Sequence, residues 1–539
     1  MGRWWLLLAL VCWPAAARAQ LELATLGGEA LRLSSTSTLL LEYRHDNYDG
    51  VNLDDNDGVV DLLGRVNVQL EWGGLGAAAR LDGLALIHRE HPCDGDACRV
   101  RLENDLRVGQ FSLWYRLAWL EVTGGDVTAQ FARGLALSIR RVDELGVDLA
   151  LRGGRVQLRA GDHTVTLVAG VTNHNEVDFA TVELIEDPHD LVAAGRHEWR
   201  VADAVVLGAH YVFSSLADTP DADGFIRYHL PGLSLEIPRL GSHLSLALEA
   251  AYLRRDASSA VEAKTNGYAI YAGLDGDLGP LTLLAEVKHY RRFRFGRNDK
   301  PSLLYHEPPS LERFDQQVPN NHNVLGGRLR LTLDLAGGRT SPFVNALVYV
   351  LNDQVDEELI AGASARLVFH VYAGLRQRIA DATLKLSVGL REDRFLDESH
   401  VDPTGKVTSE IKRRVLRTDG GLSLPMGRHS LDLKWEHRTE LRPLLTADVN
   451  LLQGRVTATY GYGGWLTVAA LISWDWDPDD GDPAQPPLLG GAEVQLHLGQ
   501  WGQLKIFGGG VHGGLICVSG SCRRVPTFTG ARTELVVRL

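Results

Sequence analysis

Carboxylates are concentrated in one polar segment near the start of the chain. They are Asp46, Asp49, Asp54, Asp55 and Asp57. Oxygen ligands at this density are those that Ca²⁺ prefers, but the spacing of a complete EF-hand loop is absent. The segment is therefore either a calcium site or a solvated acidic loop. A second acidic group with the same two interpretations contains Asp475, Asp477, Asp479, Asp480 and Asp482.

Residues 1–19 have the features of a secretory signal peptide. Met1-Gly2-Arg3 carries a positive charge, and the apolar run from Trp4 to Trp13 is too short to span a bilayer. Ala17-Arg18-Ala19 is an A-x-A cleavage site. We therefore expect the mature chain to comprise residues 20–539 and to be exported.

The cysteines beyond the signal peptide occur in two pairs, Cys93 with Cys98 and Cys517 with Cys522. An even number of cysteines in an exported chain favours disulfides, here one within each pair. A four-cysteine zinc site is the alternative. It requires the two segments to meet, and zinc-binding spacings are usually shorter.

Histidines and catalytic motifs give weaker signals. His88, Glu90 and His91 lie beside Cys93 and suit either a transition metal or the rim of a solvated loop. His197-Glu198 lacks the second histidine of a zinc-protease helix and lies in a strand pattern, so we predict no metal there. Neither a GxSxG elbow nor a phosphate-binding loop with its lysine occurs, so no enzyme is predicted. A hydrolase whose triad comes from distant residues is the remaining alternative.

Alternating polar and apolar residues dominate the rest of the chain. From Arg65 to Trp72 the polar and apolar side chains point to opposite faces, which is the period of a β-strand. Similar alternation occurs at 328–335, 384–391, 431–436 and 532–539, whereas 344–351 is apolar on both faces. The charged residues on the polar faces include Arg32, Arg65, Glu71, Arg80, Arg328, Arg330, Asp334, Lys434, Glu436 and Arg538.

Composition narrows the class of protein. The 539 residues carry a formal charge of −13 and contain no basic tract, so no nucleic-acid partner is expected. The 57 glycines and many short turns indicate an all-β chain. No later stretch approaches about 18 consecutive apolar residues, so the mature chain has no helical membrane span. It is either a soluble exported protein or a β-barrel, the other backbone arrangement that lipid permits.

Connection lengths separate these two options. Short turns, among them Gly73-Gly74, Gly109-Gln110 and Ala380-Asp381, largely alternate with long polar connections such as 46–58, 296–322 and 393–412. A transmembrane barrel with short periplasmic turns and long extracellular loops has this parity, and a soluble sandwich does not. We therefore predict an all-β fold: a single transmembrane antiparallel β-barrel of about 24 strands, within an even range of about 18–26. Both cysteine pairs then fall in extracellular loops.

Two segments have no settled place in this scheme. Residues 124–153 form two further strands, an outer loop or a segment folded into the lumen. Residues 296–322 form the longest predicted extracellular loop, and they contain Arg297, Lys300 and Arg313 together with two aromatic residues. This loop is the best candidate for a constriction folded into the barrel.

The signal through Ala19, the alternation from Glu29 to Leu539 and the Phe131-Ala132-Arg133-Gly134-Leu135 stretch together resemble bacterial outer-membrane β-barrel proteins. The similarity is to large barrels distantly related to porins and to alginate-export-type channels. The stretch is similar to an FGxGL-type segment of such barrels, with Ala132 in place of glycine. Leu539 stands where a terminal phenylalanine is usual.

The resemblance implies a location in the outer membrane, insertion by the barrel-assembly machinery and contact with outer-membrane lipid and lipopolysaccharide, to which the acidic loops would bridge divalent ions. It also implies passive passage of an unidentified small polar solute. No cofactor is expected, with a structural Ca²⁺ at the acidic loops as the alternative that their carboxylates leave open. In such a channel the charged strand residues line the lumen and set its field. Alternatively, they pair with one another in a barrel whose lumen is occluded and whose extracellular loops do the work.

Overall fold

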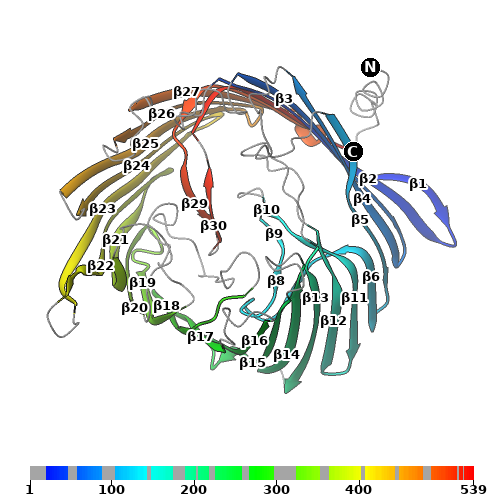
Figure 1. The fold of residues 1–539 in the computed structure, drawn as a ribbon. Helices are drawn as coiled ribbons and strands as arrows, with labels where there is room; N and C mark the ends of the chain where they lie inside the picture. The colour runs from blue at the N-terminus through cyan, green and yellow to red at the C-terminus, as the bar shows by residue number, and fades with distance from the viewer. Residues whose placement is uncertain are drawn as a thin grey trace, which may run out of the picture.

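The strands close into one antiparallel barrel. The computed structural model describes residues 20–45, 58–87, 104–142, 147–173, 189–201, 204–217, 225–257, 266–295, 323–351, 363–401, 407–443, 448–476, 487–518, 521–525 and 527–539. Within them the wall contains 24 strands, and it closes because β31 pairs with both β28 and β2 (Figure 1). The predicted fold class, including the strand number, is confirmed. No helix in these residues is long and apolar enough to cross a membrane.

Wall strands pair with their neighbours in sequence, apart from two insertions and the closing seam. The first half of the wall contains β2 (Glu29–Arg44), β3 (Val59–Trp72), β4 (Leu75–Ile87), β5 (Asn104–Arg116), β6 (Leu120–Val127), β11 (Ala150–Ala160), β12 (His163–Asn173), β13 (Leu191–Val201), β14 (Val205–Leu216), β15 (Ile226–Leu240), β16 (Leu244–Ala257) and β17 (Gly267–Leu278). The second half contains β18 (Leu281–Arg291), β19 (Val324–Leu333), β20 (Thr340–Leu351), β21 (Ala363–Ile379), β22 (Ala382–Val401), β23 (Val407–Met426), β24 (His429–Pro443), β25 (Asp448–Tyr462), β26 (Leu466–Trp476), β27 (Leu488–His497), β28 (Gly502–Val511) and β31 (Phe528–Arg538), with a short 3-10 helix (Gly499–Trp501) before β28.

Tight turns join the strands at one end of the barrel. Gly73, Gly161, Gly279 and Gly427 adopt positive φ in four of these turns, a conformation that glycine enters without the Cβ clash of other residues. The connections at the opposite end are longer, so the alternation predicted from the sequence is present. We call the two ends the turn end and the loop end.

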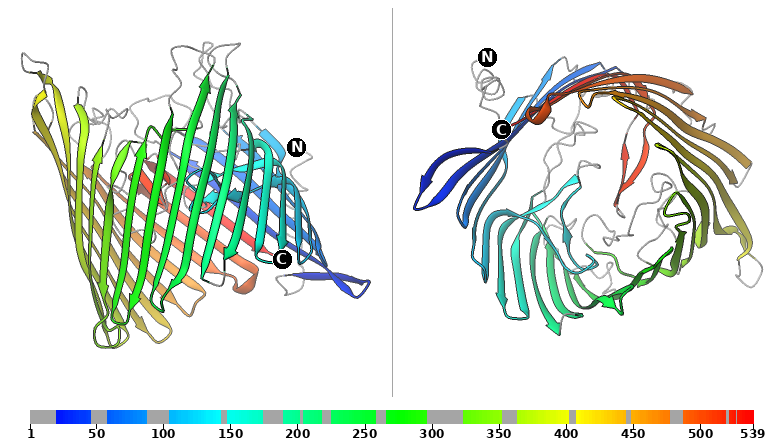
Figure 2. Two further views of the ribbon diagram at one scale, coloured as in Figure 1. Left: turned by 90° about the horizontal axis from the view of Figure 1, so that it is seen from below. Right: turned by 180° about the vertical axis from the view of Figure 1, so that it is seen from behind.

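An additional strand, β1 (Leu21–Leu26), pairs with β2 but lies outside the closed wall. All six of its residues are exposed. The β1–β2 hairpin extends away from the barrel at the turn end (Figure 2). The indole of Trp72 holds it by donating a hydrogen bond to the Leu26 carbonyl at 3.0 Å.

The two faces of β3 follow the predicted alternation with one exception. Leu70 and Trp72 are 37% and 40% exposed on the outer face, whereas Asp61 is buried on the inner face. Val66, also on the outer face, is only 4% exposed. A sandwich core is absent from the part of the chain that the structure describes, so the outer apolar residues belong to the outside of a barrel.

Two insertions fold into the lumen (Figure 1). Between β6 and β11 the chain forms the two-residue strands β7 (Ala129–Gln130), β8 (Ser138–Ile139), β9 (Arg141–Val142) and β10 (Val147–Asp148). Between β28 and β31 it forms the hairpin of β29 (Gly514–Val518) and β30 (Ser521–Val525). Of the three alternatives for residues 124–153, the ends are wall strands and residues 128–142, here called the inward segment, lie inside the barrel.

Two sequence predictions about connections are wrong. Gly109-Gln110 is not a turn: it lies within β5 at a bulge, where the register with β4 shifts between Arg80 and Leu81, and the turn follows at residues 117–119. Glycine marks bulges as well as turns, so the pattern was ambiguous.

The connection predicted at 393–412 is also wrong, because β22 continues to Val401 and β23 begins at Val407. Asp393, at the start of this stretch, accepts a hydrogen bond from Arg413 on the neighbouring strand at 3.2 Å. Its polarity therefore reflects pairing between two long strands and not a loop.

Candidate functional site in the barrel lumen

One half of the inner wall is apolar and covered. Phe131, Leu135 and Leu137 of the inward segment are buried in a cluster with inner-face residues of β11 to β21. The same cluster contains Leu347 and Tyr349, which explains why 344–351 is apolar on both faces: one face meets lipid and the other meets this lumenal core. The sequence pattern alone gave no reason to expect an apolar core inside the barrel.

A buried carboxylate fastens the inward segment to the wall. Glu249 on β16 accepts a hydrogen bond from the backbone N–H of Arg133 at 2.8 Å, and the backbone N–H of Leu135 donates to the same carboxylate. The ring of Phe131 lies 6.1 Å from the ring of His210, which is itself buried. The Phe131–Leu135 stretch therefore forms a turn whose N–H groups surround one wall carboxylate.

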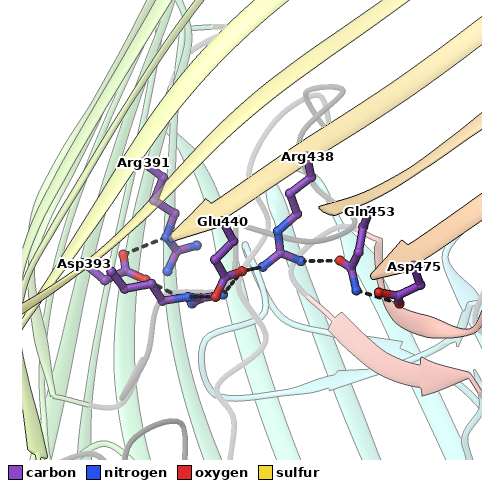
Figure 3. Close-up of polar contacts among 7 residues, drawn as sticks. Arg391, Asp393, Arg438, Glu440, Gln453 and Asp475 are labelled. Carbon is purple, nitrogen blue, oxygen red and sulfur yellow. Dashed lines mark hydrogen bonds and ion pairs between the residues drawn. The ribbon is translucent and has the colours of Figure 1, made fainter. Parts of the chain in front are cut away.

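The opposite half of the inner wall is charged (Figure 3). At the loop end, Arg391 donates a hydrogen bond to Asp393 at 2.7 Å. Arg413 donates to Asp393 and also to Glu440, and its bond to Glu440 is 2.6 Å long. Arg438 pairs with Glu440 and donates to Gln453 at 3.0 Å, and Gln453 donates to Asp475 at 2.8 Å. We call this set the outer ladder; its members are Arg391, Asp393, Arg413, Glu440, Arg438, Gln453 and Asp475.

A second group of ion pairs lies nearer the turn end. Arg417 is 2.8 Å from Asp419 and 3.6 Å from Glu436. Arg455 on β25 lies 3.5 Å from Glu436. Arg417 and Arg455 therefore pair with both acids from the side nearer the loop end.

Below these ion pairs the inner wall borders a cavity of about 1450 Å³ along β15 to β24. Serine hydroxyls and the aromatic rings of Phe343 and Tyr372 form part of its lining. Five basic and five acidic side chains face it: Arg239, Arg330, Arg376, Lys385, Lys434, Asp275, Asp277, Asp334, Asp419 and Glu436.

The outside of the wall has the opposite character. Trp119, Trp199 and Trp465 are exposed close to turns, and Tyr252 and Trp476 are exposed close to loops. Between these aromatic residues the outer face is largely leucine, valine and isoleucine. Two aromatic girdles around an apolar band are the outer surface that a barrel needs in a bilayer.

The described strands thus form a closed barrel with the outer surface of a transmembrane β-barrel, the architecture of bacterial outer-membrane barrels. In outer-membrane barrels of this architecture, short turns face the periplasm and long connections face the outside. On β22 the apolar outer face ends near Leu390, and Glu392 and Arg394 follow on the same face and pair with each other at 2.7 Å. The upper parts of β22 and β23 therefore extend beyond the apolar band of the outer face, and the outer ladder lies near the loop-end mouth of the lumen.

Comparisons with known proteins do not identify a family. No family model and no curated protein matches the sequence. Among solved structures, the siderophore receptor PirA of Pseudomonas aeruginosa aligns over 94% of this chain and 80% of its own, with 10% identity and a TM-score of 0.45. The P pilus usher PapC translocation pore aligns over 94% and 99%, with 9% identity and a TM-score of 0.42. OccK5 of Pseudomonas aeruginosa aligns over 80% and 98%, with 13% identity and a TM-score of 0.36.

The charged residues singled out from the sequence occupy different parts of the barrel. Arg65 and Arg80 both contact Asp82, at 2.7 and 2.9 Å. Arg328 donates to Asn345 at 2.7 Å. Arg32 and Glu71 are opposite each other in the β2–β3 register, and Arg538 is opposite Thr36 at the end of β31. The cavity brings together Arg330, Asp334, Lys434 and Glu436.

Other predicted sites lie outside the described residues. These are the signal peptide, the carboxylates at 46–57, residues 88–91 with Cys93 and Cys98, and the loop at 296–322. Within the described ranges no group of three or more His, Cys, Asp or Glu residues is arranged to hold a metal. The backbones of Cys517 and Cys522 are register partners across the β29–β30 hairpin.

Several lumenal residues were not singled out from the sequence. The loop prediction at 393–412 hid Asp393, and nothing in the local pattern distinguishes Arg413 or Glu249 from other charged strand residues. The alternation at 384–391 does place Lys385 and Arg391 on the polar face, so that signal was present. The contacts across strands were not, because they depend on register.

One serine–histidine pair lies on the inner wall. The Ser473 hydroxyl is 2.9 Å from Nδ1 of His512, and the backbone N–H of His512 donates to the same hydroxyl at 3.2 Å. Two bonds from one residue fasten the end of β28 to β26. These bonds form a structural link between the two strands.

Proposed function

We propose that the protein is an outer-membrane channel that passes small polar solutes along the charged half of its lumen. The observation that carries this proposal is the cavity of about 1450 Å³ against β15 to β24. It exceeds the roughly 300–1,000 Å³ of a pocket that encloses one small ligand. Its charged lining matches the polar interior of barrels that contain water.

Planar lipid bilayers test this proposal. Purified protein whose folded state is verified by heat-modifiable gel migration should produce discrete conductance steps. The same preparation after heat denaturation is the control and should produce none. Reproducible silence from the folded protein would contradict a channel.

A second candidate function is a barrel with an occluded lumen that acts through its extracellular loops. The observation that favours it is the filled apolar half, where the inward segment packs against β11 to β21. In this case the ion pairs of the other half stabilise the wall. Silence in the bilayer combined with binding of a ligand to the extracellular face of intact cells would support this candidate over the channel.

A further inference from the structure

Three basic side chains form one row across the turn-end half of the lumen. Arg376 on β21 lies directly opposite Lys385 on β22 in the strand register. Lys385 is opposite Gly421 on β23, and Gly421 is opposite Lys434 on β24. All three side chains line the cavity. We call Arg376, Lys385 and Lys434 the basic row.

Like charges in this arrangement destabilise a sheet. Side chains directly opposite on neighbouring strands are about 4.5–5.5 Å apart at Cβ, and equal charges there repel. Arg376 and Lys385 are such a pair. Asp334, 3.9 Å from Arg376, offsets part of this repulsion, whereas no ion pair with a described residue offsets the charge of Lys385.

Nearby acids do not neutralise the two lysines. Asp419 and Glu436 are engaged by Arg417 and Arg455 on the loop-ward side. Asp334 accepts a hydrogen bond from Ser341 and lies 3.9 Å from Arg376. Lys385 and Lys434 are exposed to the cavity and form no ion pair with any residue in the described ranges.

Gly421 keeps the space between the lysines open. Its φ is not positive, so the backbone conformation does not demand glycine. A Cβ at this position would meet only the Leu433 carbonyl oxygen, at 3.6 Å, which is ordinary contact. The missing side chain therefore leaves room in front of β23 at the level where both ammonium groups face the lumen.

We infer that the basic row binds an anionic solute with at least two negatively charged groups, carboxylates or phosphates. Strand spacing of about 4.8 Å puts Lys434 about 10 Å from Lys385, and the whole row spans about 14 Å. Arg376 and Lys385 bind one oxyanion through charge-assisted hydrogen bonds, and Lys434 binds the second. This inference rests on the proposed function, because it names the charge of the solute that the channel favours.

Calorimetric titration of the folded protein in neutral detergent tests binding without requiring conductance. The probes are tripolyphosphate and tricarballylate, two polyanions that separate phosphate from carboxylate recognition. Low ionic strength is needed because salt screens the attraction. We expect at least one probe to bind the wild type and the affinity to fall at least about tenfold in K385Q/K434Q, since two charged hydrogen-bond donors are lost.

The matched control is Lys505→Gln, which removes a lysine on β28 that faces Glu534 at 3.9 Å, away from the basic row. It should keep the wild-type affinity. Absence of binding by both probes, or equal affinity in the wild type and in K385Q/K434Q, would overturn the inference.

Bilayer recordings of the same variants separate this site from the proposed channel. Lysine-dependent binding with a silent barrel upholds the site and rejects the channel. A conducting barrel whose reversal potential in a salt gradient is unchanged in K385Q/K434Q, and which binds neither polyanion, upholds the channel and rejects the site.

Discussion

At the scale of single residues, Glu249 has the clearest structural role. Its carboxylate is fully buried on β16 and accepts a hydrogen bond from the backbone N–H of Arg133. The two residues are more than a hundred positions apart in the sequence. A buried carboxylate is costly unless hydrogen bonds satisfy it, and the turn at Phe131–Leu135 supplies such bonds, with the Arg133 N–H donating to Oε2. The inward segment and this wall residue therefore stabilise each other.

Replacing Glu249 with leucine should loosen the inward segment. The substitution leaves two buried backbone N–H groups without an acceptor, which costs about 1–3 kcal/mol. Amide hydrogen exchange across residues 128–142 should accelerate accordingly, while exchange in distant strands stays unchanged. Glu249→Gln keeps one acceptor oxygen and should fall between the wild type and the leucine variant; equal protection in all three proteins would contradict this role.

Replacing Ala132 should have the opposite effect on the stability of the inward segment. It adopts a φ of +46° in a turn that a hydrogen bond closes: the Gly134 N–H donates to the Phe131 carbonyl at 2.8 Å. A left-handed conformation costs alanine about 1–2 kcal/mol, and glycine adopts it freely. Ala132→Gly should therefore slow hydrogen exchange in the inward segment.

The matched control for that substitution is Ala209→Gly on the outer face of β14, where φ is not positive. Glycine in a strand interior lowers stability by about 0.5–1 kcal/mol, so this control should weaken its strand. Faster exchange of residues 128–142 in Ala132→Gly would show that the turn needs the alanine methyl group.

At the scale of elements, the bulge in β5 depends on Gly109. A Cβ at this position would meet the Asp82 carboxylate and, at 2.9 Å, Nε of Arg80. Gly109→Ala should therefore disturb the Arg65–Asp82–Arg80 ion pairs and lower the free energy of unfolding by about 1–3 kcal/mol. Urea-induced unfolding in detergent should show this as a lower midpoint concentration. Gly64→Ala is the control, because nothing lies within 4 Å of the position that its methyl group would occupy and φ is not positive; a larger effect at Gly64 would contradict the argument.

The β29–β30 hairpin contains Cys517 and Cys522, one of the two cysteine pairs predicted to form a disulfide. Paired residues of antiparallel strands have Cα atoms about 4.5–5.5 Å apart, within the range of about 4.4–6.8 Å that a disulfide spans. Because Cys517 and Cys522 are such partners, we expect them to be bonded to each other in the oxidised protein. Peptide mapping without reduction should find this local bond, and a cross-link from either residue to Cys93 or Cys98 would contradict it.

Sequence patterns predicted the wall better than the lumen. The alternation at Arg65–Trp72 follows from local chemistry, because each outer residue meets lipid wherever its strand stands in the barrel. The apolar cluster around Phe131 and Leu135, by contrast, requires a segment to fold back on distant strands. Asp393 was assigned to a loop because its polarity is compensated only across the strand register, by Arg413, and one sequence does not reveal that register.

At the scale of the whole molecule, the lumen has two unlike halves. The inward segment covers an apolar region along β11 to β21, and ion pairs with a cavity occupy a charged region along β15 to β26. On β15 and β16, which the two regions share, the apolar cluster lies nearer the loop end and the cavity nearer the turn end. Apolar side chains exclude water, whereas the charged side chains of the cavity favour it. We therefore expect solutes to pass along the charged half.

The most direct measurement places a charged label on either face of one strand. Ser387 on β22 lines the cavity, and its neighbour Val388 is 50% exposed on the outer face. In a background with Cys93, Cys98, Cys517 and Cys522 replaced by serine, a charged membrane-impermeant methanethiosulfonate should change the bilayer conductance of Ser387→Cys and leave that of Val388→Cys unchanged. Conductance that is insensitive to modification at Ser387, in protein shown by mass spectrometry to be labelled, would contradict a solute path along the charged half.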